Sequence, residues 1–334
     1  MVTIKDIAKA ANVSQATVSR VINNGPKVGP AKRAHVQRIM DELGYRPNLA
    51  ARAFVTNKFT SLGVLVPEIL DPFMATFAHH IEKLCQSMGL QTFITSGHND
   101  VTKEKLAIEH LLDHRVSAMV LHSKVISDED LLKYSELCPG LVLINRLVPG
   151  LEERCVWLDN RMGSELVVEY LFSMGHREFA YINSDFEIDD PQLRLEGVKS
   201  CLTRHNVKLP NSAIAYAPPF HEGGAQAVES LMARGTKFTA LVTYNDAMAV
   251  GAMNFMLDQG MHIPRDVSVV GFDDVVYARD ARPQLTTMRY PISMMAQAAA
   301  SIAIQSAQQQ TIDPTIQRKY TPSLIRRQSV IERM

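Results

Sequence analysis

The hydrophobic spacing of the first 45 residues predicts three short helices in one small domain. The first helix begins after Thr3, a suitable N-cap, and has four apolar residues on one face: Ile4, Ile7, Ala8 and Ala11. Asn12 can adopt the left-handed conformation that ends a helix, and Ser14 can cap a second helix over residues 15–24. Glycines and prolines then interrupt the pattern before residues 31–43 again show helical spacing. The expected order is helix, tight turn, helix, and then a third helix.

From Leu62 onward the pattern changes to short apolar runs that alternate with amphipathic stretches. About eight runs are rich in leucine or β-branched residues, and they begin at Leu62, Leu90, Ser117, Leu141, Val156, Phe179, Thr239 and Val267. Such runs predict strands buried on both faces, and the stretches between them predict right-handed helical crossovers. The predicted fold class is therefore a doubly wound α/β body with parallel sheets. Because eight strands are many for one open sheet, we expect a split near Asp159 into two similar lobes that face each other across a cleft.

Charge is distributed unevenly, although the whole chain has 35 basic and 35 acidic residues. Residues 1–60 contain ten Lys and Arg but only three Asp and Glu, a net charge of +7, so the remainder carries −7. Only the N-terminal part is therefore expected to be attracted to a polyanion such as DNA. The composition excludes both a disordered acidic tail and a uniformly basic coat.

The cysteines and apolar runs bear on the cellular compartment. The four cysteines form no C-x-x-C motif and predict neither a zinc ribbon nor a disulfide framework: Cys85, Cys138, Cys155 and Cys201. No apolar run approaches the roughly 20 residues of a membrane span, and the first residues do not resemble a secretory signal. We therefore expect a soluble, cytoplasmic protein that has no membrane partner.

Motifs for metal binding and catalysis are also absent from the sequence. His110 and His114 have i, i+4 spacing but lack the glutamate of a zinc hydrolase, so we expect a solvated or capping role. The chain contains no G-x-S-x-G and no phosphate-binding G-x-x-x-x-G-K. These observations predict no metal, no cofactor and no enzymatic activity.

The second helix has the chemistry of a DNA recognition helix. Its exposed positions are small or hydrogen-bonding, and glutamine, alanine and arginine suit adenine, the thymine methyl group and guanine or phosphate. We predict direct base readout by Gln15, Ala16 and Arg20. The alternative is a surface helix in an ordinary three-helix bundle. The complete set of DNA-contacting residues predicted in this domain is Thr3, Ser14, Gln15, Ala16, Thr17, Ser19, Arg20 and Asn23.

Several segments in order along the chain suggest a family. They are I-K-D-I-A-K-A-A-N-V-S-Q-A-T-V-S-R-V-I-N, G-Y-R-P-N-L-A-A-R-A-F, V-L-I-N-R-L-V-P-G, F-T-A-L-V-T-Y-N-D-A-M-A-V-G-A-M and V-S-V-V-G-F-D-D. Together they resemble the lactose/galactose-repressor family, especially its galactose repressors and isorepressors. The resemblance implies a helix-turn-helix DNA-binding domain, a hinge helix or linker, and a two-lobed, periplasmic-binding-protein-like body for effector binding and dimerisation. The expected bounds are 1–46, 47–59 and 60–334, with the N-lobe at about 60–159 and 291–320 and the C-lobe at about 160–290 and 321–334.

The hinge is expected to fold on DNA. Residues 48–56 contain helix-forming alanines but are too few for a stable isolated helix. In the family this segment enters the minor groove, where a leucine pair wedges open a base step; the matching residue here is Phe54. Phe54 can intercalate in the same way, or alternatively pack on the body. We expect Asn48, Ala51 and Arg52 to line the groove or contact phosphate.

The effector site is expected where the strands of the body end. A sugar needs aromatic walls and planar partners such as Asp, Asn and Arg, since its hydroxyl groups donate and accept in fixed directions. By resemblance, the site residues are Asp71, Phe73, Asn145, Arg146, Arg194, Phe220, Asn245, Asp273 and Tyr290. The alternative for the polar residues is helix capping, because Asn245 and Asp273 precede helical or turn segments.

The resulting expectation is a transcriptional repressor that binds double-stranded operator DNA as a homodimer, since two recognition helices must address a pseudo-palindrome. A small sugar, D-galactose by resemblance, would weaken operator binding. A β-glucoside, a phosphorylated sugar or a purine corepressor remains an alternative effector. A periplasmic sugar-binding protein would need a signal peptide, and an enzyme would need an activated acid, base or nucleophile.

Overall fold

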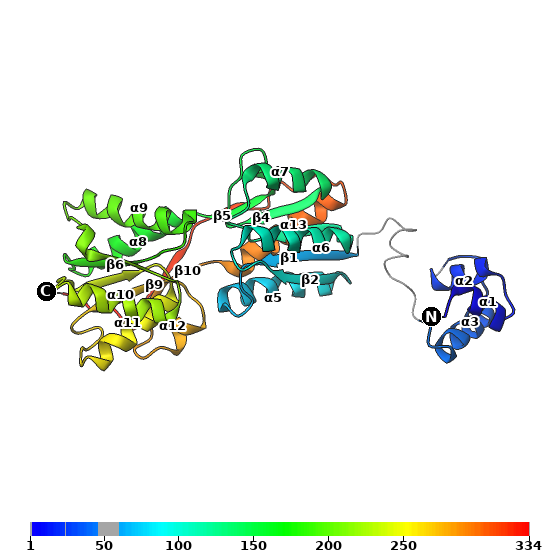
Figure 1. Ribbon diagram of the computed structural model, residues 1–334, viewed down its shortest axis with the longest axis horizontal. Coiled ribbons are helices and arrows are strands. Elements are labelled where there is room, and N and C mark those ends of the chain that lie inside the picture. Colours follow the sequence, from blue (N-terminus) through cyan, green and yellow to red (C-terminus); the bar gives the residue numbers. More distant parts are fainter. Residues whose placement is uncertain (1, 24, 46–59, 334) are drawn as a thin grey trace. The chain divides into compact units, whose positions relative to one another are not determined.

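The chain forms two compact units, residues 1–60 and 61–334. The structure, a computed structural model, describes residues 2–23, 25–45 and 60–333 (Figure 1). The predicted hinge lies outside the described residues, and with it the predicted DNA contacts at Asn48, Ala51, Arg52 and Phe54.

Residues 2–23 and 25–45 of the first unit form the three predicted helices, α1 (Ile4–Ala10), α2 (Gln15–Ile22) and α3 (Pro30–Glu42). Seven buried residues form its core: Ile7, Ala8, Ala11, Val18, Val21, Val36 and Met40. The third helix begins at Pro30, where the sequence pattern indicated an interruption. Proline is favoured at the first helical position, because an N–H group there has no partner within the helix. This unit therefore has a hydrophobic core of its own.

Local side-chain caps fix the ends of α1 and α2. Thr3 and Asp6 form a capping box, in which the Thr3 N–H donates to the Asp6 carboxylate at 2.9 Å. Asn12 has a φ of 51°, as predicted for the turn. The Ser14 hydroxyl accepts a hydrogen bond from the Thr17 N–H at 3.1 Å and so caps α2. The predicted helix, tight turn, helix arrangement is confirmed.

The body contains two six-stranded sheets. The first has the order β11-β5-β4-β3-β1-β2, with β1 (Ser61–Val66), β2 (Gln91–Ser96), β3 (Ala118–Leu121), β4 (Gly140–Ile144), β5 (Cys155–Leu158) and β11 (Lys319–Tyr320). The second has the order β12-β10-β9-β8-β6-β7, with β6 (Phe179–Ser184), β7 (Ile214–Ala217), β8 (Ala240–Thr243), β9 (Ser268–Asp273), β10 (Thr286–Arg289) and β12 (Ser323–Ile325). The predicted α/β fold class with doubly wound parallel sheets is confirmed.

The expected number of strands and two of their properties were wrong. The described residues contain twelve strands, not about eight, and the four that were not predicted are β7, β10, β11 and β12. Strands β11 and β12 have only two and three residues, β7 contains two alanines, and β10 contains two threonines and an arginine, so none shows a distinct apolar run. Strand β2 is not buried on both faces, because it lies at a sheet edge. Strand β12 pairs antiparallel with β10, whereas every other pairing is parallel.

Helices cover both faces of each sheet. We call the first sheet with its helices the N-lobe: α5 (Pro72–Ser87) packs with α13 (Ile292–Ala307), and α6 (Val101–Asp113) and α7 (Asp128–Leu137) complete the cover. The second sheet and its helices are the C-lobe, where α8 (Asn160–Ser173) packs with α9 (Asp189–Arg204), and α10 (His221–Ala233) with α11 (Asp246–Asp258). A short helix, α12 (Val276–Asp280), follows β9. No helix in the described ranges is long and apolar enough to cross a bilayer.

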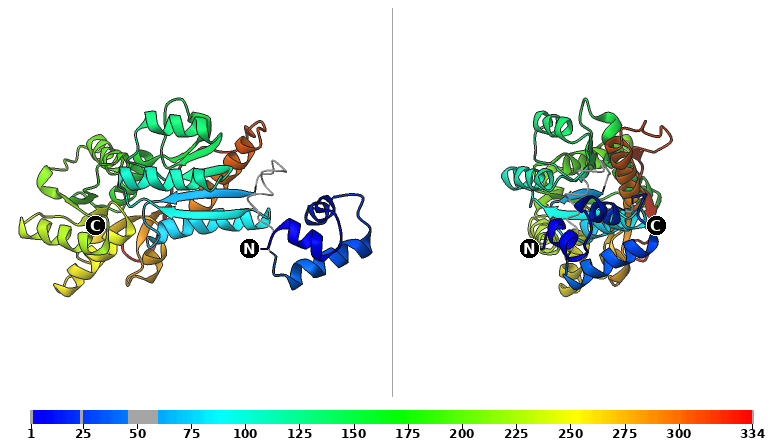
Figure 2. Two further views of the ribbon diagram at one scale, coloured as in Figure 1. Left: turned by 45° about the vertical axis from the view of Figure 1, so that its right-hand side comes forward. Right: turned by 90° about the vertical axis from the view of Figure 1, so that its right-hand side faces the viewer.

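The chain passes between the two lobes three times, after β5, after β10 and between β11 and β12. Figures 1 and 2 show the two lobes side by side, with these segments running from one to the other. Residues that follow β5 and β10 therefore lie at the junction of the lobes. This topology brings residues that are distant in the sequence to one place.

Helices α10 and α11 approach so closely at Gly224 that no side chain fits between them. A Cβ atom on Gly224 would lie 2.1 Å from the carbonyl oxygen of Met248. We expect Gly224→Ala to lower the free energy of unfolding of the body by about 2 to 3 kcal/mol, because the helices must move apart. Urea unfolding followed by circular dichroism measures the change. Gln226→Ala, at an exposed position of the same helix, should change stability by less than about 0.5 kcal/mol, and an equal loss in both variants would contradict this explanation.

Candidate functional site

Helix α2 presents a polar, cationic face in the first unit. Gln15, Ala16 and Arg20 are exposed, whereas Val18 and Val21 are buried in the core. Within the part of the chain that the structure describes, no hydrogen bond or ion pair engages the side chains of Gln15 and Arg20. Both side chains are therefore available to base edges or phosphate groups.

The other predicted DNA-contacting residues of this unit take part in local hydrogen bonds. Thr3 belongs to the capping box of α1, and the hydroxyl groups of Ser14 and Thr17 lie 2.9 Å apart. The Asn23 side-chain amide donates to the Ser19 hydroxyl at 3.4 Å. Thr3 stabilises the start of α1, whereas the other four residues stabilise the two ends of α2, the helix that carries Gln15 and Arg20.

A buried polar network joins the two lobes of the body. Lys124 follows β3 in the N-lobe, and its ammonium group lies 3.0 Å from the carboxylate of Asp190 on α9 in the C-lobe. The two side chains are only 3% and 6% exposed. Lys124 also donates to the backbone carbonyl of Asn145, and the Asn145 side-chain amide donates to Asp190 at 3.0 Å. Each charge in this ion pair therefore has further polar partners.

The network continues within the C-lobe to Arg194 and Asp273. The Asn160 side-chain amide donates to Asp190 at 3.1 Å, and its oxygen accepts a hydrogen bond from Arg194 Nε at 2.8 Å. Arg194 also lies 3.6 Å from the Asp273 carboxylate. The guanidinium group lies over two aromatic rings, those of Tyr244 and Phe272. Arg194 is thus held in a fixed position by contacts on several sides.

An aromatic wall adjoins the network on the N-lobe side. The rings of Phe73 and Tyr290 pack edge to face with centroids 4.7 Å apart. The Tyr290 hydroxyl donates to the side-chain oxygen of Asn145 at 2.5 Å. A small pocket here is lined by Phe73, Phe77, His122, Ile144, Asn145, Tyr290, Ile292 and Met295. Aromatic faces beside directed amide and hydroxyl groups are typical of a binding site for a small polar ligand.

Three of the predicted effector residues have other contacts in this structure. Arg146 donates to backbone carbonyl groups of the loop after β3 and pairs with Asp128 at 2.7 Å. Asn245 is the N-cap of α11, as the alternative interpretation anticipated. Phe220 is half exposed, and its ring packs edge to face on Phe186 with centroids 6.2 Å apart. The structure therefore does not join these residues to the network.

Burial raises the pKa of several carboxyl groups of the body, among them Asp273, Asp246 and Asp71. For Asp273, the effect of burial outweighs that of Arg194 and raises the pKa to about 7. Burial, together with the charge of Asp273, raises the pKa of Asp246 well above its ordinary value. Asp71 caps α5 by accepting from a backbone N–H at 2.9 Å, and burial raises its pKa. The site therefore contains carboxyl groups that retain protons more strongly than carboxyl groups in water do.

Asp190 and His122 have lowered pKa values. Burial disfavours ionisation of Asp190, but Lys124 and Arg194 outweigh burial and hold the pKa of this carboxyl below its ordinary value. Burial and the nearby Lys124 lower the pKa of His122 to about 4, so its imidazole is neutral at pH 7. At neutral pH the ion pair is therefore charged and the adjoining pocket carries a neutral imidazole.

The turn that carries Asp273 is strained. Asp273 has a φ of 116° and Asp274 a φ of 59°, values that suit glycine, and each such residue costs of order 1–3 kcal/mol. Arg289 pairs with the Asp274 carboxylate at 2.7 Å, and Arg327 pairs with its other oxygen. These ion pairs hold the turn in the conformation that places Asp273 beside Arg194.

Known proteins resemble both units of the chain. The sequence profile of "Bacterial regulatory proteins, lacI family" matches residues 3–48, and that of "Periplasmic binding protein-like domain" matches residues 168–330. The HTH-type transcriptional regulator GalR of Escherichia coli (strain K12) is 41% identical over 330 residues, which cover 99% of this chain and 96% of GalR. The chain belongs to the LacI family.

Other LacI-family proteins extend this comparison. GalS of Salmonella typhimurium (strain LT2) is 39% identical and covers 99% of this chain and 97% of its own length. The crystal structure of the lac repressor dimer bound to operator and the anti-inducer ONPF superposes with a TM-score of 0.86 at 26% identity, covering 99% of each chain. The family predicted from sequence is confirmed. This chain is a sugar-responsive LacI-family transcriptional repressor, and it is not an enzyme.

The sequence pattern does not single out three residues of the network, Lys124, Asn160 and Asp190. Lys124 lies three residues after the end of β3, whereas Asn145 directly follows β4, so a rule that selects residues shortly after a strand would have included it. Asp190 lies four residues before Arg194, a spacing that places both on one face of a helix. Asn160 begins α8 directly after an aspartate that caps the helix, and only the fold shows that it connects Asp190 with Arg194.

The raised pKa of Asp273 predicts a specific dependence of stability on pH. In the folded protein Asp273 keeps its proton up to about pH 7, whereas the ordinary value is 3.8. Between these values the folded state binds more protons, so the contribution of Asp273 to the free energy of unfolding falls as pH rises, by at most about 1.4 kcal/mol per pH unit. Urea unfolding of the wild type and of Asp273→Asn from pH 4 to 8 measures it. The free energy of unfolding of the wild type minus that of Asp273→Asn should decline up to pH 7 and then level off. If the two proteins show the same dependence on pH, Asp273 is not the group that holds the proton.

Proposed function

We propose that this repressor binds operator DNA as a homodimer and releases it when D-galactose binds between the lobes. The observation that carries the proposal is the network at the lobe junction, in which Asn145 of the N-lobe and Arg194 and Asp273 of the C-lobe are linked through Asp190. A ligand that contacts these groups touches both lobes at once. Its binding therefore favours one arrangement of the lobes over another.

The groups at this junction suit a neutral sugar. Arg194 supplies fixed planar donors, Asp273 supplies carboxyl oxygens, and Tyr290 and Phe73 supply aromatic faces. The two buried cations, Lys124 and Arg194, face two carboxyl groups, Asp190 at 3.0 Å and Asp273 at 3.6 Å, and Asp273 loses its proton near pH 7, so neither cation is left over for an added anion. This balance favours an uncharged effector over a phosphorylated one. Galactose is preferred among sugars because of the resemblance to the galactose repressors.

The coupling to DNA follows from the two-lobed architecture. Two copies of α2 would read the two half-sites of a pseudo-palindromic operator, with Gln15, Ala16 and Arg20 as the residues that contact bases. Galactose binding would shift the lobes and would thereby change how the two copies of the protein are placed relative to each other. A coupling free energy of about 1 to 3 kcal/mol corresponds to roughly 5- to 150-fold weaker operator binding. Because the operator lies in the cytoplasm, we place the protein there.

Galactose is expected to stabilise the full-length protein against thermal unfolding. At 100 times its dissociation constant a ligand adds about 2.7 kcal/mol, which corresponds to a rise of several degrees in Tm. A differential scanning experiment should show this rise for the wild type and a much smaller one for Asp273→Asn. Asp258→Asn, at an exposed site at the end of α11, is the control and should respond like the wild type.

The same experiment separates galactose from the other effectors. Methyl β-glucoside, glucose 6-phosphate and hypoxanthine represent the β-glucoside, phosphorylated-sugar and purine alternatives. Stabilisation by one of these compounds and not by galactose would leave the family function intact and overturn galactose as the effector.

Arg20→Ala is expected to weaken operator binding by about 1 to 3 kcal/mol, because a bidentate contact to a base is lost. Gel-shift titration at fixed ionic strength measures this loss. The control is Arg38→Ala, which removes one positive charge from α3, where Arg38 pairs with Glu42 at 3.4 Å. If both variants lose the same affinity, Arg20 contributes only general electrostatic attraction and reads no base.

A further inference from the structure

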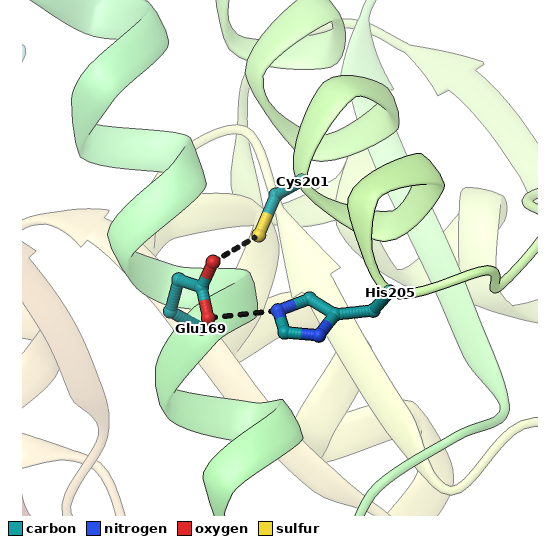
Figure 3. Close-up of side chains that lie close together, drawn as sticks. All are labelled: Glu169, Cys201 and His205. Atoms are coloured by element: carbon teal, nitrogen blue, oxygen red, sulfur yellow. Dashed lines mark hydrogen bonds and ion pairs between the residues drawn. The ribbon is translucent and has the colours of Figure 1, made fainter.

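A cluster of three different potential metal ligands lies on the C-lobe, within the pair formed by α8 and α9. Glu169 on α8 faces Cys201 on α9 and His205 at the end of that helix (Figure 3). The Cys201 thiol donates to one oxygen of Glu169 at 3.3 Å, and His205 Nε2 lies 2.8 Å from the other oxygen. The three potential ligand atoms all lie within 4.8 Å of one another. None of these residues belongs to the network at the lobe junction.

The chemistry of the three ligand atoms matches Zn²⁺. Zinc in proteins is bound by cysteine sulfur, histidine nitrogen and carboxylate oxygen at about 2.0 to 2.3 Å, which places tetrahedral ligand atoms about 3.5 Å apart. One Glu169 oxygen lies 3.3 Å from Cys201 Sγ and the other lies 2.8 Å from His205 Nε2, and the three potential ligand atoms lie within 4.8 Å of one another, so small side-chain movements bring them to this spacing. Sites with three protein ligands keep a fourth position for water. Glu169 and His205 are 45% and 25% exposed, so solvent reaches the cluster from this side.

The surroundings hold two of the three ligands in place. The His205 ring stacks on Phe172 of α8 with centroids 3.8 Å apart and an angle of 21° between the rings. Cys201 is completely buried where α8 and α9 pack together. The helices approach closely because Gly197 has no side chain; a Cβ atom there would lie 2.3 Å from the carbonyl oxygen of Arg161. Glu169 is more exposed than the other two side chains and so has the most freedom to adjust when an ion enters.

One protein cation competes for Glu169. The Arg204 guanidinium lies 3.4 Å from Glu169 and 3.1 Å from Glu165. Arg204 is half exposed, and such a contact contributes little to stability. If Glu169 turns to an ion, Arg204 loses that contact but keeps Glu165 as a carboxylate partner.

We propose that Glu169, Cys201 and His205 form a binding site for a single zinc ion, with water as the fourth ligand. On binding, the Cys201 thiol loses its proton to solvent and its sulfur coordinates the ion, while His205 coordinates through Nε2 and Glu169 through one oxygen. The ion would fasten α8 to α9. Spacing along the chain predicted no metal, because Glu169 is more than 30 residues from its partners in the sequence.

Cobalt replaces zinc in tetrahedral sites and reports thiolate coordination directly, so it provides the test. Full-length protein, reduced and freed of metal with a chelator, is titrated with Co²⁺. We expect a sulfur-to-cobalt charge-transfer band that saturates at one ion per chain and disappears when Zn²⁺ is added. Zinc should also raise the Tm of the wild type. Absence of the band, or no effect of zinc on Tm, would overturn the proposal.

Variants identify the ligands. Cys201→Ser should abolish the band, and His205→Gln and Glu169→Gln should weaken Zn²⁺ binding by at least about 10-fold, since loss of even an outer-shell partner costs 10- to 100-fold. His205→Gln changes a partly exposed residue and keeps the test decisive if Cys201→Ser does not fold. Cys138→Ser and His114→Gln are the matched controls, because both residues belong to the N-lobe. A band that survives Cys201→Ser, or is lost in Cys138→Ser, would place the ion elsewhere and sink the proposal.

Discussion

The arrangement of the two lobes depends on the buried ion pair between Lys124 and Asp190. Removing two charges from water costs several kcal/mol for each ion, and mutual attraction alone does not offset that cost. Here the carbonyl and side-chain amide of Asn145 and the amide of Asn160 supply the missing hydrogen bonds. The pair is therefore favourable only in this one arrangement of the lobes. A modest change in its partners is enough to alter the balance between arrangements, which is the property that an allosteric protein needs.

The network combines fixed groups with a link that can be broken. Arg194 is held by Asn160, by the Tyr244 carbonyl at 2.5 Å and by Asp273, all in the C-lobe. Asn145 is held by Tyr290 beside the N-lobe pocket. Groups positioned in advance in this way lose little conformational freedom when a ligand binds. Lys124 and Asp190 differ, because their contact exists only while the lobes are together, and a ligand between the lobes competes for their partners.

Sequence patterns correctly predicted the features that depend on interactions between residues close together in the chain. The caps at Thr3 and Ser14 act within three residues, and the eight apolar runs predicted as strands all form strands. The two residues of β11 form a strand only because β5 lies beside them, which no local pattern records. Position at a strand end predicted which edge of a sheet a residue occupies but not where its side chain points, so it did not show that Arg146 pairs with Asp128. The link between Lys124 and Asp190 joins residues 66 positions apart and depends wholly on the topology.

The helix pair α8 and α9 connects the surface of the C-lobe with the lobe junction. Its N-terminal turns carry Asn160, Asp190 and Arg194, and its C-terminal turns carry Glu169 and Cys201. The close approach at Gly197 makes the pair rigid, so fastening one end resists separation of the whole pair. The groups at the other end, however, already have their own hydrogen bonds. An ion at the surface would therefore stabilise the C-lobe against unfolding much more than it would change ligand affinity, because affinity depends on a difference between two folded arrangements that both contain this helix pair.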